Sequence, residues 1–308
     1  MGSSNAGVCE LLMHTFEHAC IELGVPIAHE KTSGPTTVLT FLGFIIDMMV
    51  IIPPEKLEKL RNLLQPLMQW KKVTFKELES AVGLISFRSR AIPSSRAFLR
   101  RFYDLMLYAK RPYHRIRLNG EVKADIQLLL EFIEKFNCQL FFPHRVWTSD
   151  EILKLFTDSL GTPDLGCGAY FAGKWAQLRW PHSWKTSNLI KNMTFLELVP
   201  VVLSIFLWVH LLGNKKVLFH IDNMALVSIV NKRSSKDKNI MKLIRPFVLL
   251  SMNHNVQFKA VYIPSAKNKI SDSLSRFQDN RFRFLAPETD KSPGQIPSEF
   301  LNLIYMIQ

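Results

Sequence analysis

Residues 217–230 have the sequence VLFHIDNMALVSIV, and the fold of the surrounding chain can be worked out from this stretch. Its first part, Val217–Ile221, is a run of apolar and β-branched residues, which predicts a buried strand. The strand ends at Asp222, and residues 223–231 then predict an amphipathic helix. A carboxylate between a buried strand and a helix lies where α/β folds place their chemistry. Asp is also a favoured helix cap, so a purely structural role stays open.

Two carboxylates before this stretch occupy comparable positions. Residues 152–157 and 166–171 predict the two strands of a hairpin, joined by a turn rich in Gly and Pro, and Asp158 follows the first strand. Residues 194–213 are apolar on almost all sides, which predicts a buried helix. Glu197 is its only acid and lies one turn from its start.

A fourth carboxylate lies further along the chain. Residues 258–264 (FKAVYIP) alternate in polarity as a strand does, and residues 268–277 (NKISDSLSRF) begin a helix with Asp272 near its start. The predicted order is therefore three strands, a helix, a strand, two helices, a strand and a helix.

Four carboxylates at strand ends and helix starts suit hydrolysis of a phosphodiester by two divalent ions. Mg²⁺ prefers a few carboxylate ligands and keeps positions for water and phosphate. Two ions about 3.5–4 Å apart activate the attacking water and stabilise the leaving oxygen. Structural alternatives remain, because Thr194 and Glu197 fit a T-x-x-E capping box and Asp272 suits a helix N-terminus.

Four segments in this order resemble the RNase H domain of retroelement reverse transcriptases, most closely those of the tyrosine-recombinase (DIRS-type) retrotransposons. They are FTDSLGTPDLGCGAYF, TFLELVPVV, LFHIDNMALVSIVNK and YIPSAKNKISDSLSRF. Upstream, GVPIAHEKTSGPTTVLTFLGFIID resembles the last motifs of the polymerase palm. The stretch VTFKELESAVGLISFRSRAIPSSRAFLRRF resembles the thumb and the segment after it. The resemblance covers residues 8–290.

The resemblance implies an α/β protein with an RNase H-like fold, a mixed five-stranded sheet with helices, preceded by a partial palm and a helical thumb or connection. The implied boundaries are residues 1–52 for the partial palm, 53–145 for the helical part and 146–280 for the RNase H-like domain. Residues 281–308, which contain several prolines, are expected to form an extended C-terminal tail.

The implied activity is hydrolysis of the RNA strand of an RNA–DNA hybrid. Asp158, Glu197, Asp222 and Asp272 would be the catalytic residues and the ligands of two Mg²⁺ ions, with Mn²⁺ as a substitute. Cellular RNase H enzymes carry a histidine in the loop before the last carboxylate. The loop PSAKNK lacks one, so we expect slow turnover or another group in that role. The alternative is a catalytically silent retroelement remnant that acts as a nucleic-acid-binding or interaction module.

The resemblance also implies nucleic-acid contacts in the palm, with Lys31 near the phosphates of an incoming nucleotide and Phe41, Leu42 and Gly43 at the primer end. The metal-binding Y-x-D-D turn of the polymerase does not occur in this sequence. We therefore expect no DNA synthesis by this chain without an upstream palm and fingers segment or a partner subunit.

Two groups of residues are expected to contact template–primer or hybrid phosphates, since the net charge of +13 and pI near 9.6 point to a polyanionic partner. They are Arg88, Arg90, Arg96, Arg100 and Arg101 in the helical part, and Asn223, Lys232, Arg233, Lys236, Lys238 and Lys242 after the central strand. Trp180 and Trp184, by contrast, are expected to be packed rather than to stack on bases.

Composition narrows the class of protein and the compartment in which we expect it. The 47% hydrophobic content is that of a globular protein, and the four cysteines form no C-x-x-C pair. Residues 198–212 are apolar but short for a membrane span, so we expect a core helix, no membrane association and an intracellular protein, cytoplasmic or nuclear. Residues 8–23 predict an amphipathic helix with Leu11, Leu12, Phe16, Cys20 and Leu23 facing a core. Residues 54–70, 74–90, 94–109 and 122–136 predict four further helices, and Thr74 and Glu77 form a T-x-x-E capping box at the start of the second.

Overall fold

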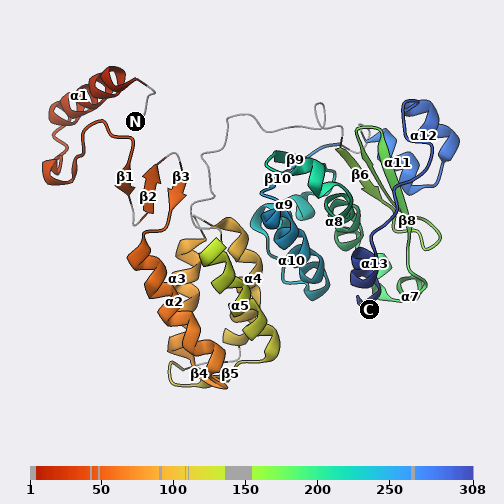
Figure 1. Ribbon diagram of the computed structural model, residues 1–308, viewed down its shortest axis with the longest axis horizontal. Helices are drawn as coiled ribbons and strands as arrows, with labels where there is room; N and C mark the ends of the chain where they lie inside the picture. Colours follow the sequence, from red (N-terminus) through yellow and green to blue (C-terminus); the bar gives the residue numbers. More distant parts are fainter. Residues whose placement is uncertain are drawn as a thin grey trace.

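The computed structural model describes residues 5–41, 44–47, 49–89, 92–107, 109, 111–135, 155–264 and 268–307. It is a mixed α/β structure, as predicted, in which a helical bundle lies beside an α/β unit (Figure 1). The elements of the N-terminal part are α1 (Ala6–Glu22), η1 (His29–Lys31) and an antiparallel sheet of β1 (Leu39–Phe41), β2 (Phe44–Asp47) and β3 (Met49–Ile51).

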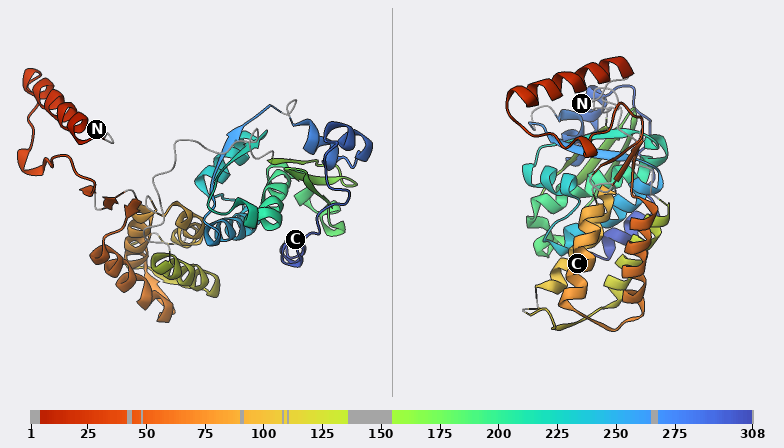
Figure 2. Two further views of the ribbon diagram at one scale, coloured as in Figure 1. Left: turned by 45° about the horizontal axis from the view of Figure 1, so that its top comes forward. Right: turned by 90° about the vertical axis from the view of Figure 1, so that its left-hand side faces the viewer.

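The predicted N-terminal helix forms, but its packing differs from the prediction. α1 lies away from the bundle and from the α/β unit (Figures 1 and 2). Of the five residues expected to face a core, Cys20 is buried, whereas Leu11, Leu12, Phe16 and Leu23 are exposed, Phe16 by 51%. The expectation is wrong for these four side chains, because α1 has little of the protein to pack against.

Four amphipathic helices form the bundle, and their bounds agree closely with the predicted ones. They are α2 (Pro54–Gln69), α3 (Phe75–Arg88), α4 (Arg96–Met106) and α5 (Gly120–Lys135), with a strand pair of β4 (Lys72–Thr74) and β5 (Arg115–Arg117) and a short η2 (Pro93–Ser95). The capping box predicted at the start of α3 is present, since Thr74 and Glu77 exchange side-chain to backbone hydrogen bonds of 2.7 and 3.2 Å.

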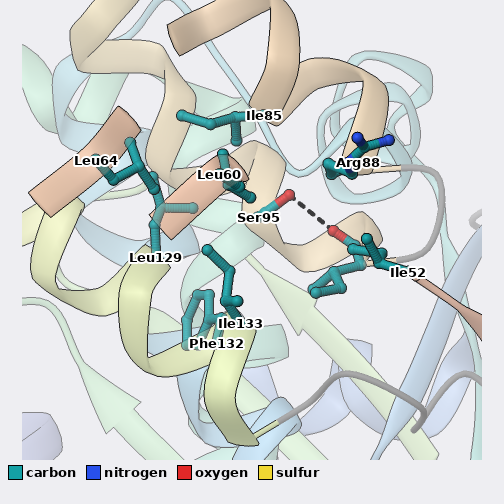
Figure 3. Close-up of a pocket in the computed structure, with 10 residues that line it drawn as sticks. Ile52, Leu60, Leu64, Ile85, Arg88, Ser95, Leu129, Phe132 and Ile133 are labelled. Atoms are coloured by element: carbon teal, nitrogen blue, oxygen red, sulfur yellow. Dashed lines mark hydrogen bonds between the residues drawn. The ribbon is translucent and has the colours of Figure 1, made fainter. Parts of the chain in front are cut away.

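The bundle is well packed. A cavity of about 10 Å³ lies between its helices. Figure 3 shows that it is lined mostly by leucine, isoleucine and phenylalanine side chains. A space of this size is close to the minimum for one water molecule, and its walls offer few polar partners. The cavity is a packing space and not a ligand site.

The α/β unit contains every element of the predicted order. Its strands are β6 (Leu155–Ser159), β7 (Gly166–Phe171), β8 (Lys174–Arg179), β9 (Lys216–Ile221) and β10 (Gln257–Tyr262). Its helices are α7 (His182–Lys185), η3 (Asn188–Lys191), α8 (Met193–Leu212), α9 (Met224–Lys232), α10 (Lys238–Asn253) and α11 (Lys269–Ser275). β6, β7 and β8 form one antiparallel ladder, and β9 and β10 form a parallel pair. β6 also contacts β9, so the two ladders are neighbours although no strand pairing joins them in the described residues.

Helix α8 is the core of this unit. Among the described residues it is the one helix long and apolar enough to cross a membrane, yet 72% of its most apolar stretch is buried inside the protein. It packs against β6, β7 and α10. Its apolar composition is thus explained by burial on nearly all sides, as predicted.

The C-terminal segment is packed, which corrects the expectation of an extended tail over residues 281–308. It contains α12 (Asp279–Leu285) and α13 (Ser298–Tyr305), and Phe300 and Ile307 are fully buried. The indole of Trp184 donates a 2.8 Å hydrogen bond to the Ile307 carbonyl. Prolines suggested a linker, but apolar residues on either side of them pack, Phe282 in a cluster with Tyr170 and Trp175, and Phe300 against Phe206 of α8. Trp184 is itself buried, as predicted.

The bundle meets the α/β unit through α4 and α10, which contact each other. Asp125 of α5, whose side chain is 2% exposed, lies at this junction. Arg101 of α4 donates to it at 2.9 Å and Arg245 of α10 at 3.4 Å. Two arginines from different units therefore share one buried carboxylate.

Candidate active site

Two of the predicted carboxylates lie at the ends of neighbouring strands. Asp158 is the fourth residue of β6, opposite Gly168 of β7, and Asp222 follows β9 directly. Both side chains are half-buried. Because β6 contacts β9, the two acids lie on adjacent strands.

Asp222 does not cap the helix that follows it. The N-cap of α9 is Asn223, whose side-chain oxygen accepts a 3.1 Å hydrogen bond from the Leu226 amide. The capping alternative left open by the sequence is therefore wrong for Asp222. Asn223 also donates to the Thr194 hydroxyl at 3.4 Å, which joins the start of α9 to the start of α8.

Glu197 is not part of a capping box either. Helix α8 begins at Met193 and is capped by Asn192, whose side-chain oxygen accepts from the Phe195 amide at 3.1 Å. Thr194 lies inside the helix, so a T-x-x-E box cannot form with Glu197. One oxygen of Glu197, Oε2, is buried without a hydrogen-bond partner among the described residues. Such an oxygen carries an uncompensated desolvation cost unless a cation or proton satisfies it.

Asp272 is in the first turn of α11, as predicted, and both of its oxygens are held by arginines. Arg276 lies 2.7 Å from Oδ1, and Arg281 lies 3.0 Å from Oδ2. Asp272 is thus the most strongly paired of the four acids.

Helix α11 is fastened to the strand that carries Asp158. Ser275 donates a 2.7 Å hydrogen bond to Asp158 Oδ2, and Asn268 donates at 2.8 Å to the Thr157 carbonyl. Gly168 permits this approach, since a Cβ added there would lie 2.3 Å from the Leu274 side chain. These contacts were not predicted. The sequence signal that could have indicated these contacts is the serine at every second position of residues 271–275. Serines on a buried helix need hydrogen-bond partners.

The carboxylates influence one another electrostatically. Burial raises the pKa of Asp158 to about 7, with further raising by the charges of Asp222 and Asp272 and an opposing effect of the Ser275 hydrogen bond. Burial also raises the pKa of Glu197 to about 8, assisted by the charges of Asp222 and Asp158. Neighbouring carboxylates in a poorly solvated site disfavour each other's ionised form. All four predicted acids therefore belong to one electrostatic cluster.

The donor set suits a hard divalent cation, although the spacing is not that of a formed metal site. Carboxylate oxygens are the ligands that Mg²⁺ and Mn²⁺ favour, and Glu197 Oε2 lacks a hydrogen-bond partner in the described part of the chain. Among the described residues, however, no group of three or more His, Cys, Asp or Glu side chains lies close enough to hold an ion. Both Asp272 oxygens are paired with arginines, so this acid is not an open ligand in this structure.

The residues predicted to contact nucleic acid do not all lie on one surface. Arg88 is only 5% exposed and stacks on Phe87 in the bundle, so the expectation that it contacts phosphates is wrong. Arg100 pairs with Asp104, and Arg101 is bound to the buried Asp125. Arg96 is exposed and donates to the Ser89 hydroxyl at 3.2 Å.

The other predicted contacts are more varied. Lys31, Phe41, Lys232 and Lys236 are exposed, whereas Asn223 serves as the cap of α9. Arg233 has a positive φ of 56° at the end of α9, and its guanidinium lies 4.5 Å from the centre of the Phe258 ring. Leu42, Gly43 and Arg90 lie outside the described residues.

No protein-family model matches this chain, and no curated protein matches it.

Proposed function

We propose that this protein is an RNase H-type endoribonuclease that hydrolyses the RNA strand of RNA–DNA hybrids with two divalent metal ions. The observation that carries the proposal is the electrostatic cluster of Asp158, Glu197, Asp222 and Asp272, which arrive from separate strands and helices. Neither Asp222 nor Glu197 caps a helix, so helix capping does not explain why an acid is present at either position. Crowded acids with perturbed pKa values are typical of a functional site.

The arrangement of the strands supports the same proposal. The antiparallel ladder of β6, β7 and β8 and the parallel pair of β9 and β10 are neighbours through β6 and β9. Joined there, they would give the mixed five-stranded sheet of an RNase H-like fold. Resemblance of four ordered segments to retroelement RNase H domains adds the substrate class.

In this mechanism the four carboxylates would be the ligands of two Mg²⁺ ions, and the ions would supply activation of the attacking water and neutralisation of charge on the scissile phosphate. The water oxygen attacks phosphorus, and the bond from phosphorus to the 3′ oxygen breaks. That oxygen takes a proton, which leaves a 3′-hydroxyl and a 5′-phosphate. Ser275 orients Asp158, and Asn223 sets the spacing between the starts of α8 and α9.

The test is cleavage of a labelled RNA–DNA hybrid by the purified chain in Mg²⁺ or Mn²⁺. Asp222→Asn removes one negative ligand at nearly constant volume and should abolish cleavage while the protein stays folded. Asp164→Asn is the matched control, because Asp164 is an exposed acid of the same unit that pairs with Lys185. It should cleave like the wild type. Equal activity of the wild type and Asp222→Asn would overturn the proposal.

The second candidate is a nucleic-acid-binding module without catalysis. It is favoured by the double pairing of Asp272 with Arg276 and Arg281, which holds this acid away from a role as an open ligand. Tight binding of the hybrid without cleavage in either metal would support this candidate instead.

A further inference from the structure

A hollow of about 480 Å³ lies between the helical bundle and the α/β unit, where α4 and α5 face α10. Basic side chains from both units dominate its lining: Arg100, Arg101, Lys236, Lys238, Lys242 and Arg245. Asp104 and Glu121 are its two acids, so six cations face two carboxylates and the lining has a net charge of +4. This volume falls within the range of ligand sites in proteins.

The arginines of this hollow are engaged in ion pairs within the protein, whereas the lysines are not and can bind a ligand. Arg100 pairs with Asp104, and Arg101 and Arg245 share the buried Asp125. Lys236, Lys238 and Lys242 are exposed, and none forms an ion pair in the described part of the chain. Paired arginines thus fix the walls, and three ammonium groups remain to bind an anion.

Helical periodicity places the basic residues of α10 together. Lys238, Lys242 and Arg245 are four and three residues apart, so they follow one face of the helix, and all three line the hollow. The acid at the start of α10, Asp237, forms no ion pair with them in the described part of the chain. Its Oδ1 accepts from two backbone amides as the helix cap, and its Oδ2 accepts from Asn192 at 2.9 Å.

The same hydrogen bond ties the hollow to the carboxylate cluster. Asn192 caps α8, and Glu197 lies five residues further along that helix, about 7.5 Å of rise. The position of the lysines at the start of α10 relative to Glu197 is therefore fixed by this contact between the two helix starts.

We propose that this hollow binds backbone phosphates of the nucleic acid whose RNA strand the carboxylate cluster cleaves, with Lys236, Lys238 and Lys242 as the phosphate contacts. Choosing the RNA–DNA hybrid as the ligand rests on the proposed function. Ammonium groups on long side chains contact phosphates without reading sequence. Contacts from both the bundle and the α/β unit would fix the hybrid relative to the cluster, so we expect them to govern substrate binding and not the chemical step.

The experiment measures binding of a fluorescent RNA–DNA hybrid to the full chain, in a buffer with chelator, over a range of salt concentrations. Lys238→Gln with Lys242→Gln removes two charges from one face of α10. If each contact releases roughly 0.7–0.9 counterions, the log–log salt slope should become shallower by about 1.4–1.8, and affinity at 0.1 M salt should fall on the order of 30-fold. Lys56→Gln with Lys59→Gln, at the start of α2 toward the C-terminal end of α5, is the matched control and should change neither value.

Further arms separate this inference from its alternatives. Lys238→Arg with Lys242→Arg keeps both charges and should bind the hybrid like the wild type. Weaker binding by the Gln variant alone is then an effect of the lost charge and not of replacing these two side chains. If the chain cleaves hybrid, the Gln variant should raise KM and leave kcat unchanged. Should cleavage fail altogether, the binding arms still decide whether the hollow takes nucleic acid. An unchanged salt slope in the Gln variant would overturn the inference. Binding of inorganic triphosphate is measured in parallel. If the Gln variant loses triphosphate binding but binds the hybrid like the wild type, the hollow is a site for small anions and the inference is also overturned.

Discussion

The hydroxyl of Ser275 donates a 2.7 Å hydrogen bond to Oδ2 of Asp158 and so connects the last turn of α11 to the end of β6. The contact joins residues 117 positions apart in the chain. It holds the carboxylate in place and stabilises its ionised form.

Replacing Ser275 by Ala should therefore weaken divalent-metal binding and raise the pKa of Asp158 further, because the ionised form loses a hydrogen-bond donor. We expect a loss of about 1 kcal/mol in unfolding free energy as well. Ser273→Ala is the control, since Ser273 is equally buried on the same helix but donates to the Ile270 carbonyl. Calorimetric titration with Mn²⁺ compares the two variants, and equal metal affinity would contradict the positioning role of Ser275.

The close approach of α11 to β7 predicts a steric effect at Gly168. A Cβ at this position would lie 2.3 Å from the Cβ of Leu274, so Gly168→Ala must displace α11. We expect destabilisation of about 1–3 kcal/mol, typical of overpacking. Gly83→Ala is the comparison, because Gly83 lies within α3 with open space around it. This substitution should stabilise the protein by up to ~1 kcal/mol, since alanine favours a helix more than glycine does. Urea unfolding measures both, and equal effects would be inconsistent with this packing.

The metal-free protein should lose stability as pH rises from about 5.5 to 8. Asp158 and Glu197 have folded-state pKa values of about 7 and 8, above the ordinary values of 3.8 and 4.5. Over this range the folded state binds more protons than the unfolded state, so the free energy of unfolding falls with pH. The double variant Asp158→Asn with Glu197→Gln should give a flatter profile. A wild-type profile that rises between pH 5.5 and 8 would show that these acids are not mutually destabilised.

The junction between the units should have its own pH dependence. Burial raises the pKa of Asp125 to about 6 from 3.8, despite the opposing charges of Arg245 and Arg101. Its contribution to stability should therefore decrease as pH rises from about 4 to 6, by at most about 3 kcal/mol. Asp125→Asn should remove this step, whereas Asp104→Asn, in a more exposed pair with Arg100, should keep it. Chemical unfolding at pH 4, 5 and 6 gives the comparison.

Local sequence determined the elements of this protein. The apolar run before Asp222, the uniformly apolar residues 194–213 and the amphipathic periods of the bundle predicted their strand and helices nearly to the residue. These patterns depend on neighbouring residues alone, so a single sequence reveals them. Prolines misled the prediction at residues 281–308, because the apolar segment that follows the last of them, Pro297, still forms a helix and packs.

Tertiary structure decided which residues meet. No local pattern could show that Asn223 rather than Asp222 caps α9, that Asn192 rather than Thr194 caps α8, or that Arg88 is buried. Each outcome depends on where a helix begins or which face packs, and energy differences of about 1 kcal/mol between alternative caps settle such choices. Long-range contacts were still less predictable. Asp125 meets Arg245, and Ser275 meets Asp158, only because packing of the large apolar surfaces brings α5 to α10 and α11 to β6.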